Sequence, residues 1–327
     1  MIGRRLQRTP LWEAWVIWLL FGLTAVAVFT TYWRLPPSEL WKTTNAGFVG
    51  GGGRAFVFLS FSAAVAAPTV LAVVSDRLAD RRAYLAGAVA FLLCATVALP
   101  GVQTENDLDP KWANLPAVAG VALAVLLTAW ASMRGRPEDA RTSRAGDRAR
   151  LLVAAVALFF AAPYIAAEFG FSLDGVPVLG WIFQTSAIRP DPDEGYAHAA
   201  VHLGHHHGLD GFLLAVSALL LSRLVGGIRR RGLRAVTAFY VSLMLVYGLT
   251  NQAQDLWDEQ VTKRGWTSWS IPHVLHPSLS AAWISMLAAA VLFYRTMFGP
   301  SARPADDRAA VSSAGLGGKD AGGRAGA

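Results

Sequence analysis

Histidines gather in one segment of the chain, directly before an apolar run. Residues 196–211 read YAHAAVHLGHHHGLDG and contain five of the seven histidines. If this segment is helical, side chains four residues apart share one face. The set at this spacing comprises Asp210, His206, His202, His198 and Glu194, and His205 falls in the same sector. The segment therefore predicts a metal site, because neutral imidazole together with carboxylate binds zinc, iron or copper(II).

Two glycines leave a second interpretation of Asp210. Gly204 and Gly208 weaken a helix, and Gly208 can end it. In that case Asp210 caps the start of the next helix and is not a ligand.

Two parts of this segment resemble motifs of a known enzyme group. HAAVH (198–202) and HLGHH (202–206) resemble the HxxxH and HxxHH boxes of membrane di-iron fatty-acid desaturases and hydroxylases, over nine residues. The resemblance implies an iron centre held by these histidines.

A second polar segment, NQAQDLWDEQVTKRGW, begins at Asn251 and continues an apolar run. Asp255 and Glu259 stand four apart, with Asp258 beside them, so a helix presents all three on related faces. One interpretation is a solvated helix with ion pairs such as Glu259 to Lys263. In the other, Asp255, Asp258 or Glu259 completes a metal sphere, orients an imidazole or acts as general base.

Three further residues lie at predicted span ends. His273 and His276 stand at the mouth of the last apolar run, and Glu168 ends the fifth. His276 is either a ligand or a residue near a helix cap. Glu168 is either a ligand or a water-exposed carboxylate, since a charge at that depth is costly without a partner.

Composition places the chain in a membrane. Hydrophobic residues make up 54% and charged residues 16%, and the mean hydropathy is +0.39. The net charge of +7 comes from basic residues in short loops between apolar runs. Such residues set the orientation of the spans in the membrane, so we expect no nucleic-acid partner. Cys94 is the single cysteine, so no intrachain disulfide or multi-thiolate metal site can form.

Eight stretches are long enough to cross a bilayer, which needs about 20 helical residues. They are residues 11–33, 55–75, 84–103, 114–133, 151–171, 210–228, 234–251 and 277–297. The predicted fold is an all-α, polytopic membrane helix bundle of about eight transmembrane helices. It occupies residues 1–297, and residues 298–327 form a disordered tail.

Orientation follows from the basic residues. With a cytoplasmic N-terminus, the inner segments hold 22 of the 29 Lys and Arg residues. Both termini are then cytoplasmic, and the histidine-rich loops 168–209 and 251–276 face outward. The predicted location is the plasma membrane, as a multi-pass protein of a bacterial inner membrane, with the lipid bilayer as the one predicted partner.

The leading hypothesis is an extracytoplasmic His and carboxylate site for zinc or iron, with copper as a further option. In a metal-dependent membrane enzyme, such a site activates water or dioxygen. Transport of metal ions or protons through a histidine vestibule, electron transfer by b-type haem, and pH sensing remain as alternatives. The haem would need one histidine from each loop.

Overall fold

The computed structural model describes residues 11–102, 108–134, 146–190, 196–204, 207–272 and 274–298. In this part of the chain, eight helical segments are long and apolar enough to cross a bilayer. Their helices are α1 (Trp12–Arg34), α2 (Gly47–Phe58) with α3 (Ala64–Leu78), α4 (Arg81–Ala95), α5 (Leu115–Arg134), α6 (Asp147–Glu168), α8 (His207–Val225), α9 (Arg231–Trp257) and α10 (Ala281–Phe298). The all-α multi-pass bundle predicted from the sequence is therefore confirmed. The predicted tail lies outside the described residues except for Phe298.

Short elements complete or join these spans. π-helical turns at Leu59–Ala63 and Asp258–Thr262 connect α2 to α3 and extend α9. Single 3-10 turns occupy Pro37–Glu39, Thr96–Ala98 and Trp112–Asn114. Between α6 and α8 lie the four-residue helix α7 (Leu179–Ile182) and the strands β1 (Ile188–Pro190) and β2 (Ala197–Ala199), which pair antiparallel.

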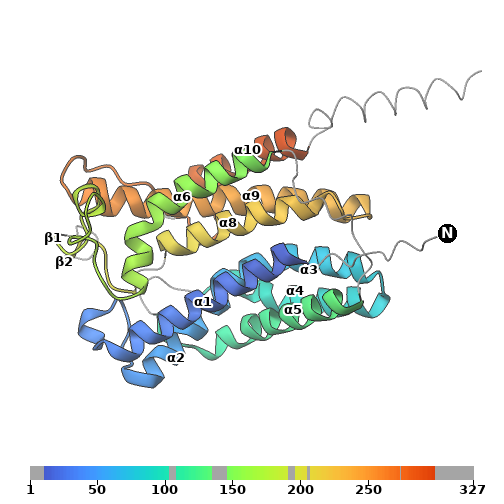
Figure 1. The fold of residues 1–327 in the computed structure, drawn as a ribbon, viewed down its shortest axis with the longest axis horizontal. Coiled ribbons are helices and arrows are strands. Elements are labelled where there is room, and N and C mark those ends of the chain that lie inside the picture. Colours follow the sequence, from blue (N-terminus) through green and yellow to red (C-terminus); the bar gives the residue numbers. More distant parts are fainter. Residues whose placement is uncertain are drawn as a thin grey trace, which may run out of the picture.

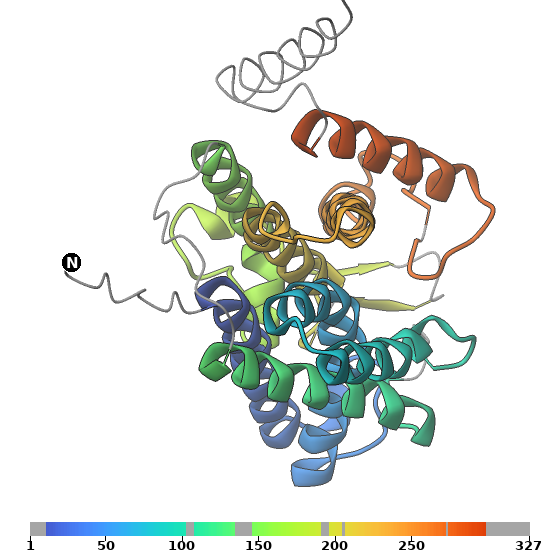
Figure 2. The same cartoon turned by 90° about the vertical axis from the view of Figure 1, so that its right-hand side faces the viewer.

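The spans form two layers. Figure 1 shows α1 to α5, in blue to green, on one side, and α6, α8, α9 and α10 on the other. The layers meet where α1 and α3 pack on α8, and α3 also contacts α9. In Figure 2, α10 stands at the edge of the bundle, where it packs on α9 and barely touches α3 or α4.

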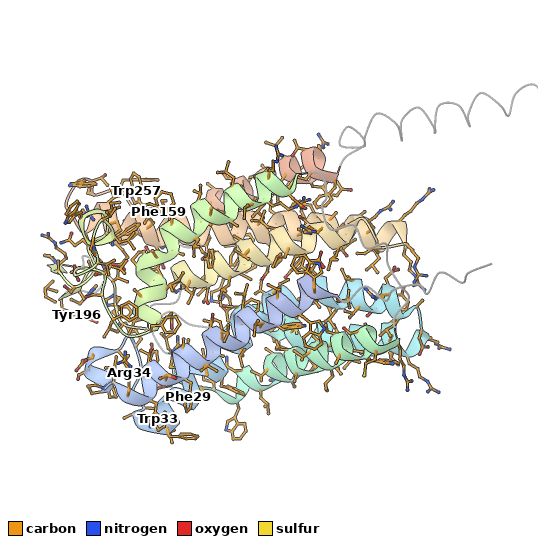
Figure 3. The ribbon with its side chains drawn as sticks, viewed as in Figure 1. Phe29, Trp33, Arg34, Phe159, Tyr196 and Trp257 are labelled. Carbon is orange, nitrogen blue, oxygen red and sulfur yellow. The ribbon has the colours of Figure 1, made fainter. Side chains whose placement is uncertain are left out.

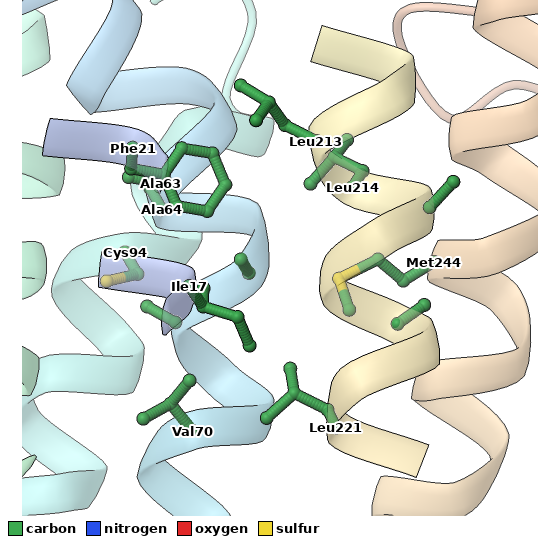
Figure 4. Close-up of a cluster of buried hydrophobic side chains, with 14 of the residues drawn as sticks. Ile17, Phe21, Ala63, Ala64, Val70, Cys94, Leu213, Leu214, Leu221 and Met244 are labelled. Atoms are coloured by element: carbon green, nitrogen blue, oxygen red, sulfur yellow. The ribbon is translucent and has the colours of Figure 1, made fainter. Parts of the chain in front are cut away.

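The core between the layers consists of apolar side chains. Side chains from α1, α3, α8 and α9 interlock there, as Figure 4 shows. Its labelled members include Ile17, Phe21, Val70, Leu213, Leu214, Leu221 and Met244, all of them buried. Close packing in this seam fixes how the two layers sit against each other.

The second span begins earlier than predicted. The predicted span starts at residue 55, after the run of four glycines, but α2 starts at Gly47. Glycine is a poor helix former, yet here it lets α2 approach α1 closely. A Cβ on Gly51 would lie 2.5 Å from the carbonyl oxygen of Phe29. As a consequence Arg54, which the predicted span leaves outside, lies within the helical segment and is 2% exposed.

Arg223 of α8 joins three helices at one end of the bundle. Its guanidinium lies 3.2 Å from Glu13 Oε1 of α1 and 2.8 Å from Asp147 Oδ2 of α6. Asp147 also pairs with Arg150 at 3.1 Å. The charges of two carboxylates and two guanidinium groups balance within this group. This balance offsets the free-energy cost of burying Glu13.

Aromatic side chains mark the opposite end, where β1 and β2 lie. Figure 3 shows Phe29, Trp33 and Tyr196 there, with Trp257 on the α9 side. The rings of Phe29 and Trp33 are 5.6 Å apart, and Trp33 is more than half exposed. Exposed aromatic rings near span ends are typical of a membrane interface.

The helical register of the histidine segment is wrong. His198 lies on β2, residues 200–204 form turns, and α8 begins only at His207. Two features exclude a helix before that point. β2 is paired with β1, and Gly204 has a φ of +75°, which a right-handed helix cannot contain. Asp210 lies in the first turn of α8, close to the alternative capping position.

Candidate functional site

A cavity of about 760 Å³ lies at the β1–β2 end of the bundle, and we call it the vestibule. Its walls come from residues 38–41, from residues 170–172 after α6, and from the strands with the turns that follow β2. Glu39 and Tyr196 on its rim are exposed, whereas His202 on its wall is only 9% exposed. The vestibule thus leads from solvent to a buried imidazole.

Two histidines meet in the vestibule. The ring centroids of His198 and His202 are 4.1 Å apart. Nδ1 of His198 lies 2.9 Å from the carbonyl oxygen of Ala199. A carbonyl only accepts hydrogen bonds, so this contact assigns the proton to Nδ1 and, in the neutral ring, the lone pair to Nε2. An imidazole with its N–H on a carbonyl is the arrangement found in metal-bound histidines.

Trp41 completes the pair as an aromatic wall. Its indole stacks on His202 with centroids 3.9 Å apart and an interplanar angle of 19°, and it lies 5.7 Å from His198. A parallel bridge between Leu40 and Leu203 brings the loop after α1 beside the histidine segment. Nothing in the sequence spacing of Trp41 identifies it as a partner of the histidines.

Asp109 holds the loop that carries Trp41. Its carboxylate accepts hydrogen bonds from the hydroxyls of Thr43 and Thr44, the first at 2.8 Å. The Leu108 amide also donates to the Lys42 carbonyl at 3.0 Å. Burial alone would raise the pKa of Asp109, but the hydrogen bonds from the 43–45 segment outweigh it, so the pKa is lowered. Asp109 therefore stays charged and keeps Trp41 in place.

Charged groups lie buried below the vestibule. Glu168 at the end of α6 is fully buried, and the charges that act on it include Arg54 of α2 and Asp210 of α8. The Arg54 guanidinium also lies over the Tyr32 ring, 5.2 Å from its centroid. Buried charges inside a span are rare and usually functional. The predicted span 55–75 left Arg54 just outside, whereas Glu168 and Asp210 stood near the ends of their predicted spans and were interpreted as possible ligands.

Tyr32 of α1 connects the two regions. Its hydroxyl lies 3.4 Å from the Trp41 carbonyl and 3.3 Å from the Gly204 carbonyl, both at the vestibule. The neighbouring Thr31 hydroxyl donates to the backbone carbonyl of Glu168. The Tyr32 ring therefore lies between the vestibule and the buried charges. Its hydroxyl approaches the carbonyls of Trp41 and Gly204, and Arg54 lies over its face.

The end of α9 is buried, so the interpretation as a solvated helix is wrong. Asp255, Glu259 and Gln260 are each at most 6% exposed. Gln260 binds both the amide and the carbonyl of Gln184, each at 2.7 Å, and so secures the segment after α7. The helix does continue beyond residue 251, as predicted, and ends with the π-helical turn.

The predicted ion pair on this helix is present. Lys263 Nζ contacts both carboxylate oxygens of Glu259 at 2.9 and 3.0 Å, and also lies 3.4 Å from the Ala200 carbonyl. Asp258 accepts a hydrogen bond from Gln254 at 3.2 Å. Asp255 acts electrostatically on Tyr164 of α6. Glu259 thus approaches the histidine segment, but through Lys263 and the backbone.

The remaining predicted site residues do not join the pair. His276 lines a different cavity, between α3, α4, α9 and α10. Glu194, His205, His206 and His273 lie outside the described residues. In the part of the chain that the structure describes, no group of three or more His, Cys, Asp or Glu side chains is placed to hold a metal. A haem with one axial histidine from each loop would need His273 as the ligand from the second loop, because His276 lines the other cavity.

Comparison with protein-family models, with curated proteins and with solved structures finds no match. The resemblance of HAAVH and HLGHH to the boxes of di-iron enzymes therefore rests on its nine residues. Fold and site together define a multi-pass helical membrane protein with a histidine-lined vestibule above a buried charge cluster.

Proposed function

We propose that the protein binds a divalent transition metal ion, zinc or iron, in its vestibule through His198 and His202. The observation that carries this proposal is the pairing of the two rings at 4.1 Å, with the proton of His198 directed to a backbone carbonyl. Imidazole nitrogens are ligands that zinc, iron and copper(II) share.

Two imidazoles supply half of a tetrahedral zinc sphere, so the proposal requires further ligands. His205, His206 and Glu194 flank the pair in the sequence and are the predicted source. The exposed Glu39 also lines the vestibule. A metal with an open coordination position at this place would activate water or dioxygen on a substrate that enters from the aqueous rim.

Metal analysis tests the proposal directly. Protein carrying an affinity tag without histidine would be purified in detergent, stripped with chelator, reloaded with zinc, iron or copper, and measured by elemental mass spectrometry. Wild type should retain one of these metals in stoichiometric amount. The double variant His198→Ala/His202→Ala should bind at least about tenfold more weakly.

His276→Ala is the matched control, because that histidine lines another cavity. It should leave metal retention unchanged. Metal-free wild type after reloading, or equal retention by the double variant, would remove the vestibule pair as a metal site.

A second function, passage of protons or metal ions, is favoured by the buried charges below the vestibule. Transport sites place ionisable groups inside the bundle, and Glu168, Asp210 and Arg54 are such groups. Flux into proteoliposomes should fall on Glu168→Gln. Flux that is absent from wild type would exclude this function.

A further inference from the structure

A second cavity, which we call the lateral cavity, lies between α3, α4, α9 and α10 and measures about 280 Å³. Aromatic rings from four elements line it, namely those of Phe61, Phe91, Tyr240, Tyr247 and Trp283. Phe91 on its rim is 45% exposed. Because the surrounding helices are membrane spans, this opening faces lipid.

Irregular helix geometry creates the lateral cavity. Phe61 stands on the π-helical turn between α2 and α3, and Pro68 interrupts the hydrogen bonding of α3. The Tyr240 hydroxyl of α9 donates to the Val65 carbonyl at 2.7 Å and so braces this stretch. On the other side, α10 packs on α9 and barely contacts α3 or α4, and the lateral cavity lies between these helices.

One polar group in the wall points to a ligand. Trp283 is only 8% exposed, and its indole N–H meets no acceptor among the described residues. Other indole N–H groups donate hydrogen bonds to acceptors within the protein. Trp18 donates to the Thr128 hydroxyl at 3.0 Å, and Trp257 donates to the Trp269 carbonyl at 2.7 Å. Buried donors normally have a partner, and the described residues supply none to Trp283, so its N–H is available to an acceptor on a bound molecule.

The lining sets the chemistry of that acceptor. Of the described residues around the lateral cavity, none is Asp, Glu, Lys or Arg. The one histidine among these described lining residues, His276, is exposed, so a phosphate or carboxylate beside Trp283 would be buried with no Lys or Arg as counter-charge, which is costly in an apolar wall. An uncharged carbonyl oxygen accepts one N–H bond and carries no charge. The volume is below that of most small-molecule pockets, so only part of a lipid enters.

We propose that the lateral cavity binds the carbonyl-bearing part of an uncharged, lipid-soluble molecule. The carbonyl oxygen accepts the hydrogen bond of Trp283 Nε1, and the attached hydrocarbon packs against Phe61 and Phe91. Two sources carry this chemistry, an ester of a neutral glycerolipid and a quinone. The proposal does not depend on metal binding in the vestibule.

Binding to delipidated protein in detergent tests the proposal, with native mass spectrometry as the readout. The two probes are dioctanoylglycerol, which carries ester carbonyls, and a benzoquinone with a decyl chain. Wild type should bind one equivalent of one of them. Selective binding of the first identifies a glycerolipid site, and of the second a quinone site.

Two variants make the test specific. Trp283→Phe keeps an aromatic ring, although a smaller one, and removes the donor, so affinity should fall about five- to tenfold, the value of one hydrogen bond. Ala98→Phe fills the cavity from an exposed position and should abolish binding. Trp112→Phe, at an indole that is 89% exposed, is the control and should bind like wild type. Wild type that binds neither probe, or Trp283→Phe that binds as tightly as wild type, would overturn the proposal.

Discussion

Arg54 is the residue on which the buried charges depend. It is 2% exposed, and Glu168 and Asp210 are the carboxylates of the same cluster. A carboxylate in a low-dielectric interior is stable only with a nearby cation or with hydrogen bonds. Arg54 provides the cation and is itself held by the Tyr32 ring and the Leu108 carbonyl.

Arg54→Leu should therefore destabilise the protein by about 3–5 kcal/mol, since it leaves an uncompensated buried charge. Arg54→Leu/Glu168→Gln should recover part of this loss, because the second change removes one carboxylate. Unfolding midpoints in detergent measure both. Arg295→Leu, at an exposed arginine, should change little. Additive effects of the two substitutions would show that Arg54 and Glu168 are not coupled.

The sequence predicts that histidines gather at one place, but it does not predict the geometry in which two of them meet. His198 and His202 do meet, but through a strand and a turn and with Trp41 as their neighbour. The contact that creates this arrangement joins Leu40 to Leu203, far apart in the chain. Spacing along a sequence reports neighbours on one element, so it contains no information on that contact.

At the scale of elements, tertiary packing decides where helices begin and end. Four glycines suggested a loop, yet α2 runs through them because they fit against α1. The polar end of α9 suggested a solvated helix, yet Gln260 buries it against the segment after α7. The late predicted start of α2 is an error and the solvated helix was one of two open interpretations, and in both cases packing outweighs local propensity.

The segment between α6 and α8 depends on one carboxylate. Asp174 accepts hydrogen bonds from the Thr185 hydroxyl at 2.8 Å and from the Ser186 amide at 3.1 Å. Burial alone would raise the pKa of Asp174, but the hydrogen bonds from Ser186, Thr185 and Ser172 outweigh it and lower the pKa well below its usual range. A lowered folded-state pKa stabilises the fold at pH values above the unfolded pKa. That contribution is lost as pH falls through the folded value.

Hydrogen exchange should show this loss at one amide. The protection factor of the Ser186 amide, corrected for intrinsic rate, should fall as pH drops below about 4. The Gln184 amide, bonded to the uncharged Gln260 side chain, serves as the internal control and should not respond. In Asp174→Ala, Ser186 should be weakly protected at every pH. An unchanged Ser186 profile in that variant would contradict the role of Asp174.

At the scale of the molecule, the sequence predicts most of the fold. Eight spans follow from the length of helix that a bilayer requires, and all eight are present. The two-layer arrangement does not follow, because every span is apolar over much of its surface. Which apolar faces meet is decided by small residues and by polar groups such as Arg223.

Labelling of single cysteines tests the predicted orientation. In a Cys94→Ala background, Ser38→Cys at the vestibule end should react with an impermeant maleimide on intact cells. Gly226→Cys at the other end, where an added Cβ has open space, should react only after permeabilisation. The reverse pattern would invert the topology and place the vestibule in the cytoplasm.

The vestibule straddles the boundary between the two layers. Trp41 comes from the layer of α1 to α5, whereas His198 and His202 come from the segment that leads into α8. A molecule that contacts residues on both sides would connect the two layers across this boundary. By thermodynamic linkage, its binding free energy favours the arrangement in which both sides are in place. A ligand bound in the vestibule would therefore stabilise the contact between Trp41 and the histidine segment.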